Sequence, residues 1–146
     1  MPATGARNDP FVVFRFAVNL EGITLGGFTE CSGPQLETEF QEYMEGGLNT
    51  FVHKFPTRTK QSNITLKRGI VDRELWDWYY DLMQGRVVPK SAEIVVRDPS
   101  GGKVVLRWVI EGALPVKWQG PDLNASQSNV AVETLELSYL MLRRHA

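Results

Sequence analysis

The chain of 146 residues has few of the side chains that most enzymes use at their centres. It has one cysteine, Cys31, and two histidines, His53 and His145. One cysteine excludes an intramolecular disulfide. No HExxH, CxxC, GxSxG or phosphate-loop GxxxxGK[ST] pattern occurs. The sequence therefore predicts a protein that is not an enzyme and that holds no metal and no cofactor.

Long apolar runs and an excess of charge of one sign are also absent. The sequence has no run of about 18 apolar residues and no secretory leader, so we expect synthesis in the bacterial cytoplasm and no membrane anchor. The formal net charge of -1 gives no bulk attraction to nucleic acid or to anionic membranes. The length fits a single domain over residues 11–146, after a flexible N-terminal arm over residues 1–10.

One segment, residues 72–84, has a convincing helical pattern. Asp72 is a suitable N-cap, and Gly85 can end the helix in the left-handed conformation. The apolar stripe that should lie against a sheet consists of Leu75, Trp76, Tyr79, Leu82 and Met83. The opposite side carries Trp78 and Tyr80, which indicates either a partner surface or a wider buried stripe.

The other segments alternate between apolar and polar residues, which is typical of strands. Such patterns predict strands over 14–20, 23–31, 36–44, 51–55, 64–67, 92–96, 104–110, 112–117 and 131–143. The first and second should form one hairpin, the third and fourth another, and residues 98–102 a turn. We therefore predict a mainly β fold, an antiparallel β-sandwich or small β-barrel with one flanking α-helix. Long apolar edge strands favour pairing between subunits in a closed ring.

Acidic and basic side chains form two separate clusters. The acids are Glu37, Glu39, Glu42 and Glu45, and the bases are Lys54, Arg58, Lys60, Lys67 and Arg68, interleaved with Phe51 and Phe55. A pair of acids would suit glycoside chemistry, but Glu37 and Glu39 share a strand face and are better explained as solvated charges. The basic cluster would suit single-stranded nucleic acid. A solvated loop, or one half of a subunit contact that faces the acids, is the favoured interpretation.

Three separated blocks carry a resemblance to a known family. They are DPFVVFRFAVNLEGITLGGFTECSG, YMEGGLNTFVHKFPTRTKQSNITLKRGIVDRELWDWYYD and LPVKWQGPDLNASQSNVAVETLELSY. In this order they resemble the tail tube proteins of contractile phages and the inner tube proteins of related contractile injection systems. The resemblance covers residues 9–142 and implies a structural subunit. Its hexameric rings would stack around a lumen for cargo or DNA, and a contracting sheath would drive the tube through a target envelope.

The resemblance also implies a role for particular residues. The implied ring-stacking loop, 42–60, has the candidate residues Glu42, Tyr43, Glu45, Gly46, Gly47, Asn49, Lys54, Arg58 and Lys60. The flanking helix and a connector over 120–129 supply the candidate subunit contacts Trp78, Tyr80, Asp122 and Asn124. The polar alternates that we expect to line the lumen are Arg15, Asn19, Glu37, Glu39 and Lys67.

The implied partners are further copies of the chain, a contractile sheath protein, baseplate and terminator proteins, and a luminal cargo that is a protein effector or DNA. After assembly the subunit would belong to a virion tail or an extracellular contractile particle. Phage tails, bacteriocin-like particles and extracellular injection systems all remain open. The alternatives are a baseplate or tube-initiating ring adaptor of the same family, an effector carrier like the ring proteins of type VI secretion, and an unrelated small β-barrel that binds single-stranded nucleic acid.

Overall fold

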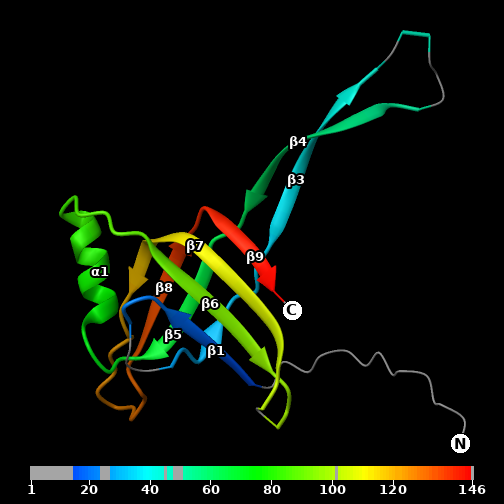
Figure 1. Ribbon diagram of the computed structural model, residues 1–146. Coiled ribbons are helices and arrows are strands. Elements are labelled where there is room, and N and C mark those ends of the chain that lie inside the picture. Colours follow the sequence, from blue (N-terminus) through cyan, green and yellow to red (C-terminus); the bar gives the residue numbers. More distant parts are fainter. Residues whose placement is uncertain (1–14, 24–26, 45, 48–50, 101, 146) are drawn as a thin grey trace, which may run out of the picture.

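The computed structural model describes residues 15–23, 27–44, 46–47, 51–100 and 102–145. The predicted arm over 1–10 and the loop candidates Glu45 and Asn49 lie outside these ranges. In chain order the elements are β1 Arg15–Leu20, β2 Glu30–Cys31, β3 Leu36–Tyr43, β4 His53–Gln61, β5 Ile64–Gly69, α1 Glu74–Met83, β6 Lys90–Arg97, β7 Val104–Gln119, β8 Val132–Ser138 and β9 Met141–His145 (Figure 1). The predicted mainly β fold with one helix is confirmed.

Seven strands form one antiparallel sheet in the order β1-β6-β7-β8-β5-β2, with β9 paired to β7 outside this path. The long strand β7 joins two halves of the sheet. Its first part pairs with β6 and β9, and its last part pairs with β8. Side chains from both halves and from α1 meet in one core cluster that includes Ile94, Ile110, Leu66, Leu135 and Leu75. Among the described residues the sheet ends at β1 and β2, so it is open rather than a closed barrel.

Gly112 marks the place where β7 passes from one half of the sheet to the other. Its φ of 68° lies in the left-handed region that favours glycine, and the pairing register with β6 shifts there. The side chain of Leu140 covers it, and a Cβ at Gly112 would lie 2.7 Å from Leu140 Cδ1. The bulge keeps 104–119 a single strand, so the prediction of two strands over 104–110 and 112–117 is wrong.

Two other predicted strand arrangements are also wrong. Residues 14–20 and 23–31 do not form a hairpin, because β1 pairs with β6 and the described residues near the turn share a single bridge, Leu20 to Ile23. The predicted strand over 131–143 is interrupted between β8 and β9. The second predicted hairpin is correct in its pairing, although β4 runs on to Gln61, into residues that we expected to be a connector.

The helix lies within the predicted range, but a different face of it is buried. The N-cap is Arg73, one residue after the predicted Asp72, although Asp72 Oδ1 still accepts a hydrogen bond of 2.9 Å from the Glu74 backbone amide. Gly85 follows the helix with a φ of 87°, as expected. The buried helical residues are Leu75 and Trp78, whereas Trp76 and Met83 are exposed. Trp78 is 5% exposed and donates a hydrogen bond of 2.8 Å from Nε1 to the Val88 carbonyl oxygen. The predicted apolar stripe is therefore wrong at these positions.

Candidate assembly surfaces

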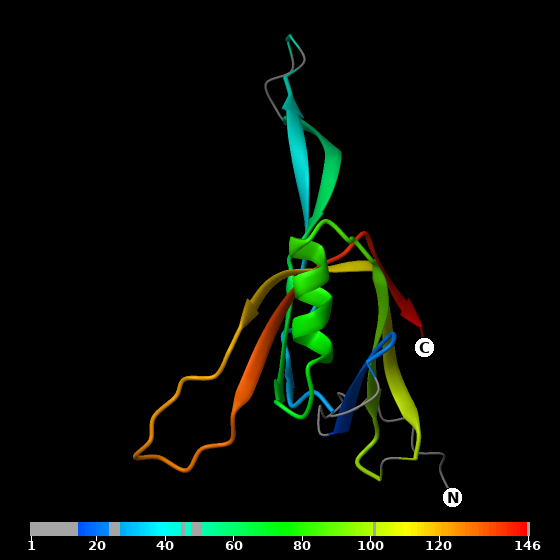
Figure 2. The ribbon, with the colours of Figure 1, turned by 90° about the vertical axis from the view of Figure 1, so that its left-hand side faces the viewer.

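The hairpin of β3 and β4 extends away from the seven-stranded sheet as a narrow arm (Figures 1 and 2). Six of its large apolar side chains have more than half of their surface exposed in the single chain, namely Leu36, Phe40, Tyr43, Met44, Phe51 and Phe55. An isolated two-stranded hairpin is marginally stable, and exposed apolar patches of this kind mark contact sites. The arm is the strongest candidate for an assembly contact.

One face of the arm carries charged side chains near its base and aromatic side chains further out. Near the base, Arg58 Nε lies 3.5 Å from Glu39 Oε2, and Lys60 also pairs with Glu39. The hydrogen bond to Glu39 and its negative charge raise the pKa of Lys60. Further out, the ring of His53 lies between Phe51 and Phe55, with centroid separations of 4.9 and 6.5 Å. Glu39 thus pairs with two bases of the same hairpin, and the aromatic side chains lie beyond them toward its tip.

The structure does not bring the predicted basic cluster together. Lys54, Arg58 and Lys60 lie on the arm, whereas Lys67 lies on β5. Arg68 is fully buried, so it is not accessible to a nucleic acid. A continuous basic groove with aromatic side chains, which binding of single-stranded nucleic acid requires, is therefore not formed by these five residues.

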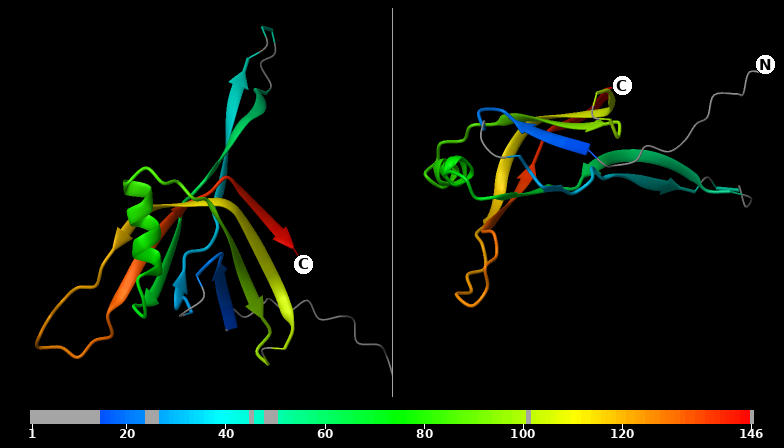
Figure 3. Two further views of the ribbon diagram at one scale, coloured as in Figure 1. Left: turned by 60° about the vertical axis from the view of Figure 1, so that its left-hand side comes forward. Right: turned by 90° about the horizontal axis from the view of Figure 1, so that it is seen from below.

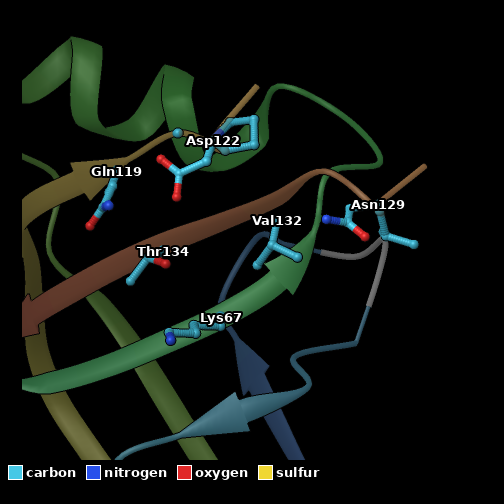
Figure 4. Close-up of a pocket in the computed structure, with 9 residues that line it drawn as sticks. Lys67, Gln119, Asp122, Asn129, Val132 and Thr134 are labelled. Carbon is cyan, nitrogen blue, oxygen red and sulfur yellow. The ribbon is translucent and has the colours of Figure 1, made fainter. Parts of the chain in front are cut away.

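The predicted connector over 120–129 is part of a longer loop between β7 and β8, residues 120–131, which we call the connector from here on. It lies at the opposite end of the molecule from the arm in all views (Figures 1, 2 and 3). Asp122 and Asn124 are exposed there, as expected for contact residues. Asn124 Oδ1 accepts hydrogen bonds from the Ser126 amide (3.0 Å) and hydroxyl (2.7 Å), which fold the loop on itself. A cavity of about 340 Å³ separates the connector from the sheet, and its walls include Lys67, Gln119, Asp122, Asn129 and Thr134 (Figure 4).

The exposed side of α1 is a third surface. Trp76 and Tyr80 are exposed and their ring centroids are 6.2 Å apart. Tyr80 is therefore accessible, and its role as a subunit contact stays a prediction. Trp78 is not, because its ring is buried against the sheet. The pattern of the sequence misassigned Trp78 because seven of the ten helical residues are apolar or aromatic, which leaves the direction of the stripe ambiguous.

The five predicted lumen residues lie on three separate surfaces. Arg15 and Asn19 belong to β1, Glu37 and Glu39 to the arm, and Lys67 to the outer face of β5. Two rows of polar side chains cross the sheet on that outer face, and these rows were not identified from the sequence. One is Glu30, Lys67, Thr134 and Gln119, and the other is Thr65, Glu136 and Lys117. The signal was present in the alternation of β5 and β8, whose inward alternates are buried.

Within the described ranges, no group of three or more His, Cys, Asp or Glu side chains could hold a metal ion. In the same ranges, no helix is long and apolar enough to cross a membrane. The notable surfaces are therefore those of the arm, the connector, the helix and the polar rows.

Comparison with solved structures places this architecture among tube proteins. The chain is similar to a chain of the sheath-tube complex of an extracellular contractile injection system, PVC, in the extended state, with a TM-score of 0.82 and 26% identity over 95% of this chain and 93% of that chain. It is also similar to a chain of the anti-feeding prophage tube-terminating cap, with a TM-score of 0.84 and 25% identity over 99% of both chains. Hcp1 from Flavobacterium johnsoniae shares the fold, with a TM-score of 0.59 and 14% identity over 90% of this chain and 94% of that chain. No curated protein matches.

The fold and its projecting surfaces define the class as a structural tail tube or terminator-like protein of contractile injection systems. A family model described as T4-like virus tail tube protein gp19 matches residues 12–143. The chain belongs to this tail tube family, and it is a structural protein rather than an enzyme.

Proposed function

We propose that the chain is the repeating subunit of an inner tube, in which hexameric rings stack around a lumen through which a protein effector or DNA passes. The observation that carries this proposal is the arm of β3 and β4, with its exposed aromatic side chains, in a member of the tail tube family. A contractile sheath surrounds the tube, and baseplate and terminator proteins close its ends. The similar chains in sheath-tube, baseplate and cap structures support these partners.

Stacking follows from the positions of the arm and the connector. Strand β5 starts at Ile64, next to the end of the arm, and ends at Gly69, where the Ile70 amide donates a hydrogen bond of 2.9 Å to the Ala131 carbonyl oxygen of the connector. The arm and the connector thus extend from opposite ends of the same strands. In the tube, the arm contacts the adjoining ring and covers Phe51 and Phe55 there, which removes their apolar surface from water.

Ring closure uses the open sheet. Strands β1 and β2 form the two ends of the described sheet order, and pairing across subunits satisfies their free backbone groups. The exposed aromatic pair of α1, Trp76 and Tyr80, faces the sheath in this arrangement. The connector, with Asp122 and Asn124, contacts a neighbouring subunit.

The outer face of β2, β5, β8 and the end of β7 lines the lumen. Its polar rows stay hydrated and pair each base with an acid, since Lys67 Nζ lies 3.5 Å from Glu30 Oε2 and Lys117 is opposite Glu136. A wall of this kind has no net charge and binds neither a polyanion nor a polycation strongly. Among the five lumen candidates, Lys67 is the one that we retain. Arg15, Asn19, Glu37 and Glu39 lie elsewhere and do not line the lumen.

The test is assembly of the purified protein, measured by negative-stain electron microscopy and mass photometry over a concentration series. We expect rings and hollow tubes from the wild-type chain. Replacement of residues 45–49 by a short flexible linker should leave folded subunits that do not stack, and the same linker in place of residues 98–102, a different hairpin turn, should leave stacking intact. Filaments from the first variant would show that the arm is not the stacking contact.

A baseplate or tube-terminating ring is the second candidate. The likeness to chains of the anti-feeding prophage baseplate (TM-score 0.80, 26% identity over 95% of this chain and 97% of that chain) and cap supports it. Such a subunit would form rings that end a tube instead of extending it. In the same concentration series, single rings that never lengthen would favour this function over that of a repeating subunit.

A further inference from the structure

Four side chains form a hydrogen-bonded cluster at the base of the connector, which we call the Arg68 cluster. It consists of Arg68 and Glu133, which are buried, and Asp72 and Trp118, which are half-buried. Arg68 is 0% and Glu133 2% exposed. Arg68 Nε donates to Glu133 Oε1 and Arg68 Nη2 donates to Asp72 Oδ1, both at 2.8 Å. Trp118 Nε1 donates to the second oxygen of Glu133 at 3.1 Å. These hydrogen bonds join the end of β5, the start of α1, the end of β7 and the start of β8.

The cluster holds both ends of the connector. Trp118 precedes the connector by two residues and Glu133 follows it by two, so their hydrogen bond closes the loop at its base. Gly120, the first connector residue, lies against the same indole ring, where an added Cβ would be 3.0 Å from Trp118 Cη2. The position of the Trp118 ring therefore determines how the connector leaves the sheet.

The same cluster holds the first turn of the helix. Asp72 Oδ1 accepts from the Glu74 amide as well as from Arg68. Trp118 contacts Trp76 of α1 edge to face, with ring centroids 4.9 Å apart and planes at 68°. The helix and the connector are thus fixed to one another through Trp118, although they are separate in the sequence.

Stability alone does not account for such a cluster, because well-packed apolar residues in place of a buried ion pair are often as stable or more stable. Hydrogen bonds are directional, whereas apolar packing is not. The hydrogen bonds of the cluster therefore restrict the four segments to a single arrangement. We propose that Trp118 is a positioning residue, which with Glu133 and Arg68 fixes the connector in the shape that presents Asp122 and Asn124 to a neighbouring subunit. The inference rests on the proposed function only for the identity of that partner.

The substitution Trp118→Phe tests this inference, because it removes the Nε1 donor and keeps an aromatic ring. Hydrogen exchange measured on the unassembled subunit should be about tenfold faster at the hydrogen-bonded amides of the connector and its base, those of Ser126, Gln127 and Ile70, since a hydrogen bond to a charged group is lost, and unchanged in β6. The concentration needed for tube assembly should rise by about the same factor. The matched control is Trp108→Phe, which makes the same chemical change in the other half of the sheet and should leave connector exchange as in the wild type.

A second variant, Gly120→Ala, displaces the Trp118 ring without removing any hydrogen-bonding group, and it should also speed connector exchange. If both variants leave connector exchange unchanged, or speed exchange equally throughout the chain, the positioning role is wrong. If the connector loosens as expected and tubes still assemble at the wild-type concentration, Trp118 positions the connector, but the presentation of Asp122 and Asn124 to a neighbouring subunit is refuted. If the wild-type chain forms no tubes, the proposed function fails and the exchange data still decide the inference.

Discussion

Gly112 gives the sharpest prediction about the fold, because two independent costs arise when it is replaced by alanine. The first is conformational, since an L residue in the left-handed region costs about 1–2 kcal/mol. The second is steric, since the new Cβ would lie 2.7 Å from Leu140 Cδ1 and 2.8 Å from Cγ. Overpacking costs about 1–3 kcal/mol, and the lower value applies because the Leu140 side chain is 80% exposed and can move. We expect Gly112→Ala to lower the free energy of unfolding by about 2–3 kcal/mol.

Urea denaturation of four proteins separates these costs. Leu140→Ala alone should change the unfolding free energy by less than about 0.5 kcal/mol, because the side chain is exposed. In the double variant with Gly112→Ala the two shortest contacts disappear and only the one with the Cβ of residue 140, at 3.1 Å, is left, so that mainly the conformational cost of about 1–2 kcal/mol should remain. Gly102→Ala is the matched control, since an added Cβ there meets its nearest neighbour, Ser100 Oγ, at 3.7 Å. A Gly112→Ala protein as stable as the wild type would refute the assignment of this residue to the bend of β7.

Two further predictions concern the thiol and the helix. Burial raises the pKa of Cys31 from 9.0 to about 11, so alkylation of the native protein at pH 8 should be about 100-fold slower than that of an ordinary thiol and should become fast on unfolding. Because the folded state holds this proton more tightly, its contribution to stability should fall as the pH rises from about 9 to about 11, measured by denaturation with Cys31→Ser as the control. Trp78→Phe should cost about 2 kcal/mol through the lost hydrogen bond and volume, whereas Tyr80→Ala, at an exposed position, should cost less than about 0.5 kcal/mol in the same assay. Equal losses for the two helix variants would contradict the observed orientation of α1.

Local patterns predicted the elements well and their partners poorly. The alternation around Ile64 and Leu66 identified β5, and Asp72 and Gly85 located the helix to within two residues at its start. The pairing of β1 with β6, by contrast, joins residues more than seventy positions apart, and an alternating segment fits any neighbour that offers an apolar face. The sequence predicts that 14–20 pairs with the next strand along the chain, 23–31. This prediction is wrong because alternation alone does not specify the partner of a strand.

Among the candidate surfaces, too, features that depend on local sequence were predicted correctly, and features that depend on distant residues were not. The ring-stacking loop was placed on a hairpin from the glycine-rich tip and the alternating flanks of 36–55, and the structure has a hairpin there. Trp78 was misassigned because its partner, the Val88 carbonyl oxygen, belongs to the chain beyond the helix. The Arg68 cluster was not anticipated, because Arg68 was interpreted as one member of a surface basic cluster. A buried arginine is recognisable only when the acids that pair with it, Asp72 and Glu133, are known to be close.

The common direction of β5 and β8, between the arm and the connector, has a mechanical consequence. Hydrogen bonds of an antiparallel pair are perpendicular to the strands. A load applied from the arm to the connector therefore acts in shear on the pairing that extends from Ile64 opposite Leu137 to Gly69 opposite Val132. In shear these bonds share the load and must break together, whereas a sideways pull would open them one after another. In the tube that we propose, the arm contacts the adjoining ring, so a force along the stack would load the pairing of β5 with β8 in shear, the direction in which this pairing is strongest.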